Sequence, residues 1–263
     1  MLVLVFLSGI VLMLYPTLSN YWNSFHQSRV VASYTNQIEQ LDSSVYEAIR
    51  KEADAFNSVL FNKMTPFMLN ESERAQYYST LNVTGNNVMG SIEIPAIDVK
   101  LPIYHGTSET VLQVGIGHIE GTSLPIGGPS THSVLSGHRG LPSALLFSNL
   151  DKVVLGDRFY LYVLNEKLTY EVDQILTVEP SDIDALSIEH DQDFCTLVTC
   201  TPYGINSHRL LVRGHRVIDN SDKPSRTVTS NARMIDPKYI FAILCCAPLS
   251  IWLIVSIFPF KKR

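Results

Sequence analysis

The stretch Asp193-Phe-Cys-Thr-Leu-Val-Thr-Cys-Thr-Pro-Tyr-Gly204 carries two cysteines five positions apart. The apolar and β-branched residues between them predict a strand, and Pro202, which cannot continue a central ladder, predicts that the strand ends just after Cys200. Residues an odd number apart face opposite sides of a strand, so geometry argues against a disulfide between Cys195 and Cys200. We expect Cys195 to pack in the core and Cys200 to be presented at the strand end. A metal site would need more ligands at short spacing.

Similar short runs, cut by glycine and proline, fill the chain from Ser91 onward. They predict a mainly β fold, a compact barrel or sandwich of seven or eight strands, with a hairpin turn at 165–167. The strand-like runs are 91–97, 99–105, 131–138, 158–164, 168–178, 194–200 and 208–217. Residues 21–61 instead repeat apolar residues at steps of three and four, which predicts one or two amphipathic helices. These apolar residues are Ile38, Leu41, Val45, Ile49, Ala53 and Phe56.

Uncharged apolar runs stand at both ends of the chain, at 1–15 and 239–260. The second has 22 residues, enough to cross about 30 Å of hydrocarbon as a helix, and Lys261-Lys-Arg263 follows it, which favours a cytoplasmic C-terminus. The first run lacks a preceding basic residue and a small-residue cleavage site, which favours an uncleaved anchor. We therefore expect an anchor at 1–18 and an extracellular helical extension at 19–88, with a candidate lid at 62–70. A β-domain at 89–218 follows, then a polar linker at 219–238, a transmembrane helix at 239–260 and a cytoplasmic basic tail at 261–263.

The remaining composition excludes several function classes. The chain has 263 residues, 46% of them hydrophobic, and a net charge of −5. No basic cluster or phosphate-binding glycine motif suggests nucleic acid or nucleotides as partners. The small external cysteine count argues against a disulfide scaffold.

A thiol with an ordinary pKa of about 8.5 is mostly protonated at neutral pH, so a nucleophilic Cys200 needs a partner that favours the thiolate. His138 ends a second strand-like run in Ser136-Gly-His-Arg-Gly140 and is a candidate, although a lone histidine is more often structural. Arg209 lies nine positions after Cys200. If 201–207 forms a turn, Arg209 begins the adjacent antiparallel strand and could hold a thiolate or an oxyanion.

Three motifs, Thr196-Leu-Val-Thr-Cys200 with Thr-Pro after it, Ser136-Gly-His-Arg139 and Asn206-Ser-His-Arg-Leu210, occur together and in the same order as in sortases, and residues 88–217 resemble that family. The two predicted anchors and the helical extension resemble the pilus-assembling class C. The resemblance implies a closed eight-stranded barrel, Cys200 as nucleophile, His138 as its imidazole partner and Arg209 as oxyanion or substrate clamp. It implies cleavage of an LPXTG-like sorting signal through a thioacyl-enzyme, with transfer to a lysine of the next pilin. No cofactor or metal is implied.

The resemblance also suggests a peptide groove and a lid. In sortases the loop before the nucleophile strand, here 179–192, helps to form the groove, so Ile183, Leu186 and Ile188 are candidate contacts. Thr199 and Asn206 are further candidates for substrate binding. Pilus sortases often carry an Asp-Pro-aromatic lid; Thr65-Pro-Phe67 has the aromatic residue but not the acid. It is either a degenerate lid over Cys200 or a loop that packs on the barrel.

Three other functions stay open at this stage. A thiol peptidase would use the same cysteine and histidine and give the acyl group to water. A cell-wall-anchoring sortase would give it to a lipid-linked precursor. A silent surface scaffold would bind pilins without chemistry, although the joint presence of cysteine, histidine and arginine speaks against it.

Overall fold

The structure is a computed structural model that describes residues 2–63 and 67–218. Its helices are α1 (Leu2–Glu39), α2 (Ser43–Phe61), α3 (Glu71–Ser79) and α4 (Glu109–Leu112), with 3-10 turns η1 (Pro95–Ile97), η2 (Leu150–Lys152) and η3 (Asp184–Leu186). Its strands are β1 (Val88–Ile94), β2 (Val99–His105), β3 (Ile116–His118), β4 (Thr131–Ser136), β5 (Arg158–Val163), β6 (Glu166–Val178), β7 (Asp193–Thr201) and β8 (His208–Arg216).

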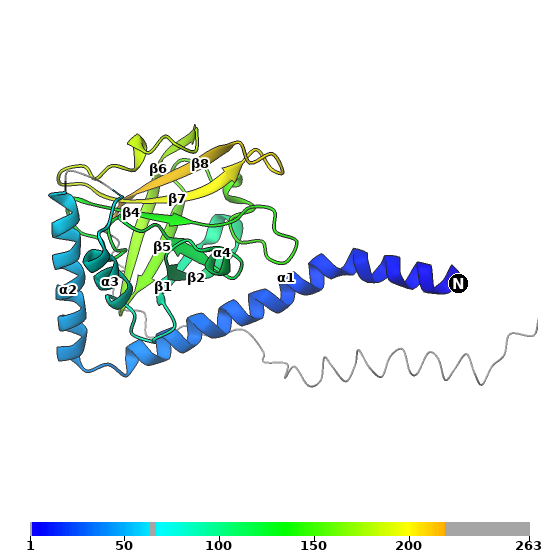
Figure 1. Ribbon diagram of the computed structural model, residues 1–263, viewed down its shortest axis with the longest axis horizontal. Coiled ribbons are helices and arrows are strands. Elements are labelled where there is room, and N and C mark those ends of the chain that lie inside the picture. Colours follow the sequence, from blue (N-terminus) through cyan, green and yellow to red (C-terminus); the bar gives the residue numbers. More distant parts are fainter. Residues whose placement is uncertain (1, 64–66, 219–263) are drawn as a thin grey trace, which may run out of the picture. The chain divides into compact units, whose positions relative to one another are not determined.

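The strands close into a barrel in the order β1-β2-β3-β4-β7-β8-β6-β5 (Figure 1). The pairs β2–β3 and β4–β7 are parallel, and the other neighbours are antiparallel. This confirms the predicted mainly β, closed eight-stranded barrel. The period-two runs located seven strands, but β3 was not predicted because three residues are too short for a pattern. The turn between β5 and β6 lies at Leu164 and Asn165, one residue earlier than predicted, with Leu164 at a φ of 52°.

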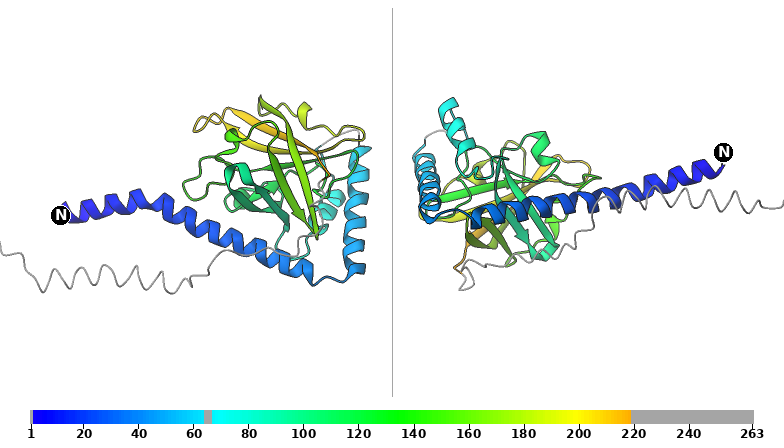
Figure 2. Two further views of the ribbon diagram at one scale, coloured as in Figure 1. Left: turned by 180° about the vertical axis from the view of Figure 1, so that it is seen from behind. Right: turned by 90° about the horizontal axis from the view of Figure 1, so that it is seen from below.

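The N-terminal helices are packed on the barrel and share its core. Tyr34 of α1 is buried, donates its hydroxyl hydrogen to the Met89 carbonyl at 2.9 Å and accepts from the Leu164 amide at 2.8 Å. Figure 2 shows α1 passing along β1 and β2. Ala53 and Phe56 of α2 are buried in the same apolar cluster. The predicted helical region is therefore confirmed, although it contains a third helix, α3.

Helix α3 lies beyond residues 21–61, the part of the extension whose apolar spacing predicted helices. Asn70 accepts from the Glu73 amide, and the Glu73 carboxylate accepts from the Asn70 amide, which is a capping box. The pattern Asn70-Glu-Ser-Glu73 was visible in the sequence and would have predicted this start.

Of the two predicted membrane segments, the structure describes only the N-terminal one. Residues 239–260, with the linker before them and the basic tail after them, lie outside the described residues. The anchor predicted at 1–18 falls within α1, and among the described residues no helix is long and apolar enough to cross a membrane.

Strand β7 separates two apolar regions. Cys195 and Leu197 point into the main core of the barrel, whereas Val198 belongs to a second cluster on the outer face. We call this second group the outer cluster; its buried members are Val134, Leu186, Val198 and Leu211, and Phe67, Ile119, Leu176, Val178 and Ala185 pack against it. Because side chains alternate along a strand, Cys200 faces the same side as Val198. The barrel thus presents Cys200 beside an apolar surface.

Candidate active site

Cys200 and Arg209 are direct neighbours across the β7–β8 pair. The antiparallel register sets Cys200 opposite Arg209 and Val198 opposite Leu211. Opposed side chains in such a pair have Cβ atoms about 4.5–5.5 Å apart. The sequence placed Arg209 at the start of the adjacent antiparallel strand, next to the thiol, and this placement is confirmed.

His138 reaches the same level through the parallel β4–β7 pair. The register runs from Thr131 opposite Asp193 to Ser136 opposite Val198, and Gly137 continues it by donating its amide hydrogen to the Val198 carbonyl at 3.0 Å. Continued by one more residue, this register would set His138 level with Cys200. The three candidate residues therefore lie on, or directly after, three adjacent strands at the same end of the barrel.

Gly137 is required for this approach. A Cβ atom there would lie 2.7 Å from Ile116 Cδ1 and from Phe147 Cδ2, both in the packed core. The Thr199 hydroxyl donates to the Gly137 carbonyl at 2.8 Å and fixes the strand exit. The glycine before His138 is thus a packing requirement that holds the imidazole at the end of β4.

The Arg209 guanidinium is oriented by the β7–β8 turn. Its Nη1 donates to the Asn206 carbonyl at 3.1 Å and to the His208 carbonyl at 3.0 Å. A guanidinium has five N–H donors, so two bonds from one nitrogen leave it able to bind an anion as well. The turn therefore fixes a permanent positive charge beside the thiol.

Arg139 is a residue of this region to which the sequence analysis assigned no role. It donates to Asp151 at 2.6 Å and to the Thr201 hydroxyl at 3.4 Å, and its guanidinium lies 5.7 Å from the Tyr203 ring centre. These contacts join the segment after His138 to the end of the Cys200 strand. Its position directly after His138 was the available signal, but only the fold shows what it contacts.

The candidate groove residues separate into different environments. Leu186 is buried in the outer cluster, while Ile183, three residues earlier in the chain, is 42% exposed. Ile188 packs against the main core instead. Thr199 is buried and, being adjacent to Cys200 in the strand, points to the opposite side, where it bonds to Gly137. The structure therefore brings Leu186 to the outer cluster, but not the Ile188 or Thr199 side chains.

Asn206 enters the site through its backbone. It adopts a φ of 60° in the β7–β8 turn, and its carbonyl accepts from Arg209. Its placement supports the orientation of Arg209. Whether its amide also contacts a substrate stays a prediction.

Phe67, the aromatic residue of the candidate lid, packs against the outer cluster. Its backbone lies over Gly121, where a Cβ atom would come within 2.5 Å of the Phe67 Cα, and Gly121 has a φ of 83°. Phe67 is thus next to the apolar surface that Cys200 borders. Thr65 and Pro66 lie outside the described residues.

Two buried histidines are structural. Burial lowers the pKa of His118 to about 3 and that of His132 to about 4, so both are neutral at pH 7. His132 Nδ1 lies 2.8 Å from the Ser187 carbonyl, and its Nε2 lies 2.7 Å from the Thr196 hydroxyl. His132 therefore ties the groove loop to β4 and β7.

Cys195 fits the predicted role of core filler. It is free, fully buried, and burial raises the pKa of its thiol well above the ordinary value. Cys200 is also free and is partly exposed. No group of histidine, cysteine or acidic residues that could hold a metal occurs within the described ranges.

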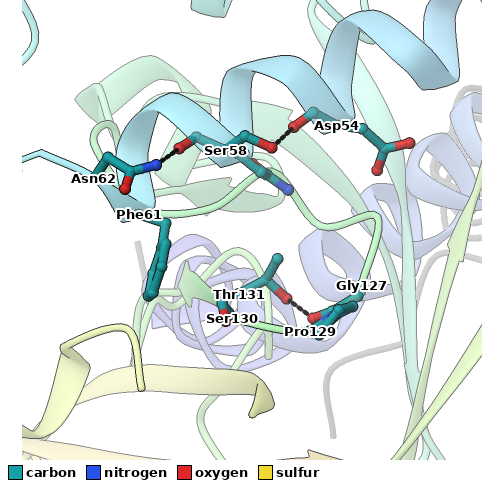
Figure 3. A pocket seen from close by; sticks show the side chains of 10 residues that line it. Asp54, Ser58, Phe61, Asn62, Gly127, Pro129, Ser130 and Thr131 are labelled. Carbon is teal, nitrogen blue, oxygen red and sulfur yellow. Dashed lines mark hydrogen bonds between the residues drawn. The ribbon is translucent and has the colours of Figure 1, made fainter. Parts of the chain in front are cut away.

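A pocket of about 320 Å³ lies at the other end of β4 (Figure 3). It is formed by the last turns of α2, including Ser58, Phe61 and Asn62, and by residues 127–131. Thr131 begins β4, whereas His138 follows its end, so this pocket is separated from Cys200 by the length of the strand.

Comparison with known proteins agrees with this barrel and site. The sortase domain model matches residues 92–217. Sortase C1 of Streptococcus agalactiae is 51% identical, with a TM-score of 0.71 over 73% of this chain and 100% of that chain. Sortase C of Streptococcus pneumoniae, described with regard to catalysis and pilin substrate specificity, is 48% identical, with a TM-score of 0.66 over 73% of this chain and 97% of that one.

A third similar structure is that of Clostridium perfringens sortase C with the C-terminal cell wall sorting motif. It is 43% identical, with a TM-score of 0.64 over 73% of this chain and 99% of that one. The chain belongs to the sortase family. The solved structures that it resembles here are class C sortases, in agreement with the class indicated by the sequence.

Proposed function

We propose that this chain is a class C sortase that joins proteins covalently by transpeptidation. The observation that carries the proposal is the register of three adjacent strands: Cys200 lies opposite Arg209 beside the outer cluster, and the neighbouring strand β4 ends two residues before His138 at the same end of the barrel. The substrate is a peptide with an LPXTG-like sorting signal, whose apolar residues bind along Leu186 and Ile183. The sorting motif bound by the C. perfringens relative supports this substrate class.

In the first step the Cys200 thiolate attacks the carbonyl carbon of the Thr–Gly bond in the sorting signal. A tetrahedral intermediate forms, and its oxyanion is held by the Arg209 guanidinium. The C–N bond then breaks, and the protonated imidazole of His138 donates its proton to the departing amine. The product is a thioester on Cys200.

In the second step an amine attacks the thioester, and the C–S bond breaks to release Cys200. His138 takes the proton from the attacking amine and is ready for the next cycle. Two successive acyl transfers conserve the energy of the peptide bond, so the reaction needs no nucleotide. We propose a pilin lysine as the acceptor, since the pneumococcal relative is described with a pilin substrate.

The proposed location is the outer surface of the cell membrane of a Gram-positive bacterium. Support comes from the sequence alone: the uncharged run at 239–260 with Lys261, Lys262 and Arg263 after it. The catalytic barrel would then face outward, where surface proteins pass.

The acceptor separates this proposal from its rivals. The full-length chain is incubated with an LPXTG-type peptide, with and without a lysine-containing acceptor peptide, and the products are identified by mass spectrometry. We expect an amide-linked conjugate that depends on the acceptor and is absent in Cys200→Ala. Hydrolysis alone would identify a thiol peptidase, transfer only to a cell-wall precursor would identify an anchoring enzyme, and no turnover would favour a scaffold.

A further inference from the structure

His138 faces a carboxylate from a part of the chain that the sequence did not connect with it. Glu109 Oε2 lies 3.6 Å from His138 Nε2. This Nε2 is shielded from solvent and makes no hydrogen bond within the described residues. The His138 side chain is 28% exposed and that of Glu109 is 72% exposed. The carboxylate therefore meets a shielded ring nitrogen from the solvent side.

Glu109 is held in this position by its own helix. Gln113, one turn further along, donates its side-chain amide to Glu109 Oε1 at 2.6 Å. That bond occupies one carboxylate oxygen, while the other oxygen faces His138. The bond from Gln113, followed by the neighbouring His138, also lowers the pKa of Glu109, so this carboxyl is ionised at neutral pH.

The fold fixes α4 next to the strand that leads to His138. A Cβ atom at Gly117 would lie 3.2 Å from the Leu112 side chain, so α4 packs directly on β3. Gly117 pairs with Ser136 of β4, two residues before His138. The position of Glu109 relative to the imidazole is thus set by packing and strand register.

The other charged groups near His138 are directed elsewhere. Arg139 is bonded to Asp151 and Thr201, and Arg209 is bonded to two carbonyls of the β7–β8 turn. Cys200, on the strand that pairs with β4, is the thiol that the proposed mechanism brings to His138. Within the described contacts, Glu109 is the acidic side chain paired with His138.

We propose that Glu109 is a positioning residue whose carboxylate orients the His138 imidazole and stabilises the ion pair that His138 forms with Cys200. The inference rests on the proposed function, in which the thiol proton moves from Cys200 Sγ to His138 and leaves a thiolate and an imidazolium. A carboxylate within 4 Å favours the charged imidazolium over the neutral ring. Glu109 takes no proton itself; its negative charge raises the fraction of molecules that carry the reactive ion pair.

The direct test is the alkylation rate of Cys200 by iodoacetamide, measured in the full-length chain by mass mapping at pH 6.5 and at pH 9.5. In Glu109→Gln we expect the rate at pH 6.5 to fall about three- to tenfold, within the range of a partly exposed ion pair. At pH 9.5 the thiol ionises without help from an imidazolium, so the rate should be unchanged. Glu39→Gln, which alters net charge equally at the end of α1, is the matched control.

Two further measurements separate a positioning role from a structural one. Gln113→Ala keeps the carboxylate but removes the bond that orients it, so it should show a smaller fall in the same direction. The effect of Glu109→Gln should shrink in 1 M salt, because an exposed pair is screened. Equal rates for Glu109→Gln and the unaltered protein at pH 6.5, or an equal loss at both pH values, would overturn the proposal.

Alkylation needs no peptide, so this test is independent of the proposed function. If the unaltered protein cleaves no sorting peptide but Glu109→Gln still shows the loss at pH 6.5, the transpeptidase proposal fails and the role of Glu109 stands. If peptide turnover is normal and the pH-dependent loss is missing, the role of Glu109 fails and the transpeptidase stands.

Discussion

The two faces of strand β7 give its two cysteines opposite surroundings. On the inner face Cys195 is fully buried, and burial raises the pKa of its thiol. On the outer face Cys200 is partly exposed and stands opposite a fixed guanidinium, and the strand on its other side, β4, leads to His138. The comparison teaches that the surroundings, not the residue type, make a thiol reactive.

The largest expected effect comes from replacing each cysteine in turn, which tests whether Cys195 and Cys200 have different roles. Cys200→Ala should reduce peptide transfer to background, a loss of at least about 10³-fold, because the proposed mechanism passes through a thioester on this thiol. Cys195→Ala should leave the rate close to that of the unaltered protein and lower only its stability. Initial rates of conjugate formation by liquid chromatography measure both. Activity that survives in Cys200→Ala would contradict the assignment.

Two arginines project outward from β8, Arg209 and Arg213, and replacing each one tests whether Arg209 has a special role in catalysis. Arg209→Ala should lower kcat/KM by about 10²–10³-fold, the cost of losing a donor to an oxyanion. Arg213 has the same orientation on β8 but pairs with Asp173, so Arg213→Ala should affect folding more than turnover. Steady-state kinetics and thermal melting of both variants test this. Similar kinetic losses in the two would show that Arg209 has no special role.

Paired leucine substitutions compare the core with the outer cluster. Leu197→Ala in the core should lower the free energy of unfolding by about 2–5 kcal/mol. Leu186→Ala should cost less than about 2 kcal/mol, since its cluster borders solvent. It should instead raise KM for the sorting peptide, because Leu186 lines the proposed groove. Urea unfolding and peptide kinetics report the two effects, and an unchanged KM in Leu186→Ala would remove it from the groove.

The buried histidines make the inner structure sensitive to acid. His118 and His132 have folded-state pKa values of about 3 and about 4, both below the ordinary value of about 6.5 in an unfolded chain. Below pH 6.5 the unfolded chain therefore binds more protons than the folded protein, and stability falls as pH falls. Between pH 6.5 and 5 each histidine contributes at most about 1.4 kcal/mol per pH unit.

Urea midpoints at pH 7, 6 and 5 test this dependence. His132→Gln should flatten the decline, because it removes one of the two buried imidazoles. A decline of equal slope in His132→Gln would show that His132 is not responsible.

The smallest effect concerns the candidate lid. If Phe67 covers the groove without an acidic latch, Phe67→Ala should raise Cys200 alkylation by less than about tenfold, or about 1.4 kcal/mol. The rate is measured with iodoacetamide against Met68→Ala, an exposed neighbour. A much larger rise would indicate a tightly latched lid, and no rise would leave Phe67 as a packing residue.

Much of the barrel could be predicted because its strands alternate or form apolar runs between glycines and prolines. The short β3 and α4 lack enough residues for a pattern, and the capping box that starts α3 was present but not used. The parallel pairing of β4 with β7 could not be read locally, so the approach of His138 to Cys200 came from the family resemblance.

The site residues show the same limit. The alternation of side chains that separated Cys195 from Cys200 also places Thr199 on the inner face. The same argument from the sequence would have removed Thr199 from the predicted substrate-binding residues. Glu109 is 29 residues from His138 in sequence and reaches it only through the packing of α4 on β3. The local sequence pattern predicts where strands lie and which face each side chain occupies. Contacts between segments distant in sequence are known only once the strands have closed into the barrel.

The most direct test of the account is to locate the acyl group on the protein itself. The full-length chain is mixed with an LPXTG-type peptide without acceptor, quenched in acid, digested and mapped by mass spectrometry. The account predicts a thioester on the peptide that contains Cys200, with Cys195 unmodified. Consumption of the sorting peptide with the acyl group on Cys195, or on no cysteine at all, would contradict it.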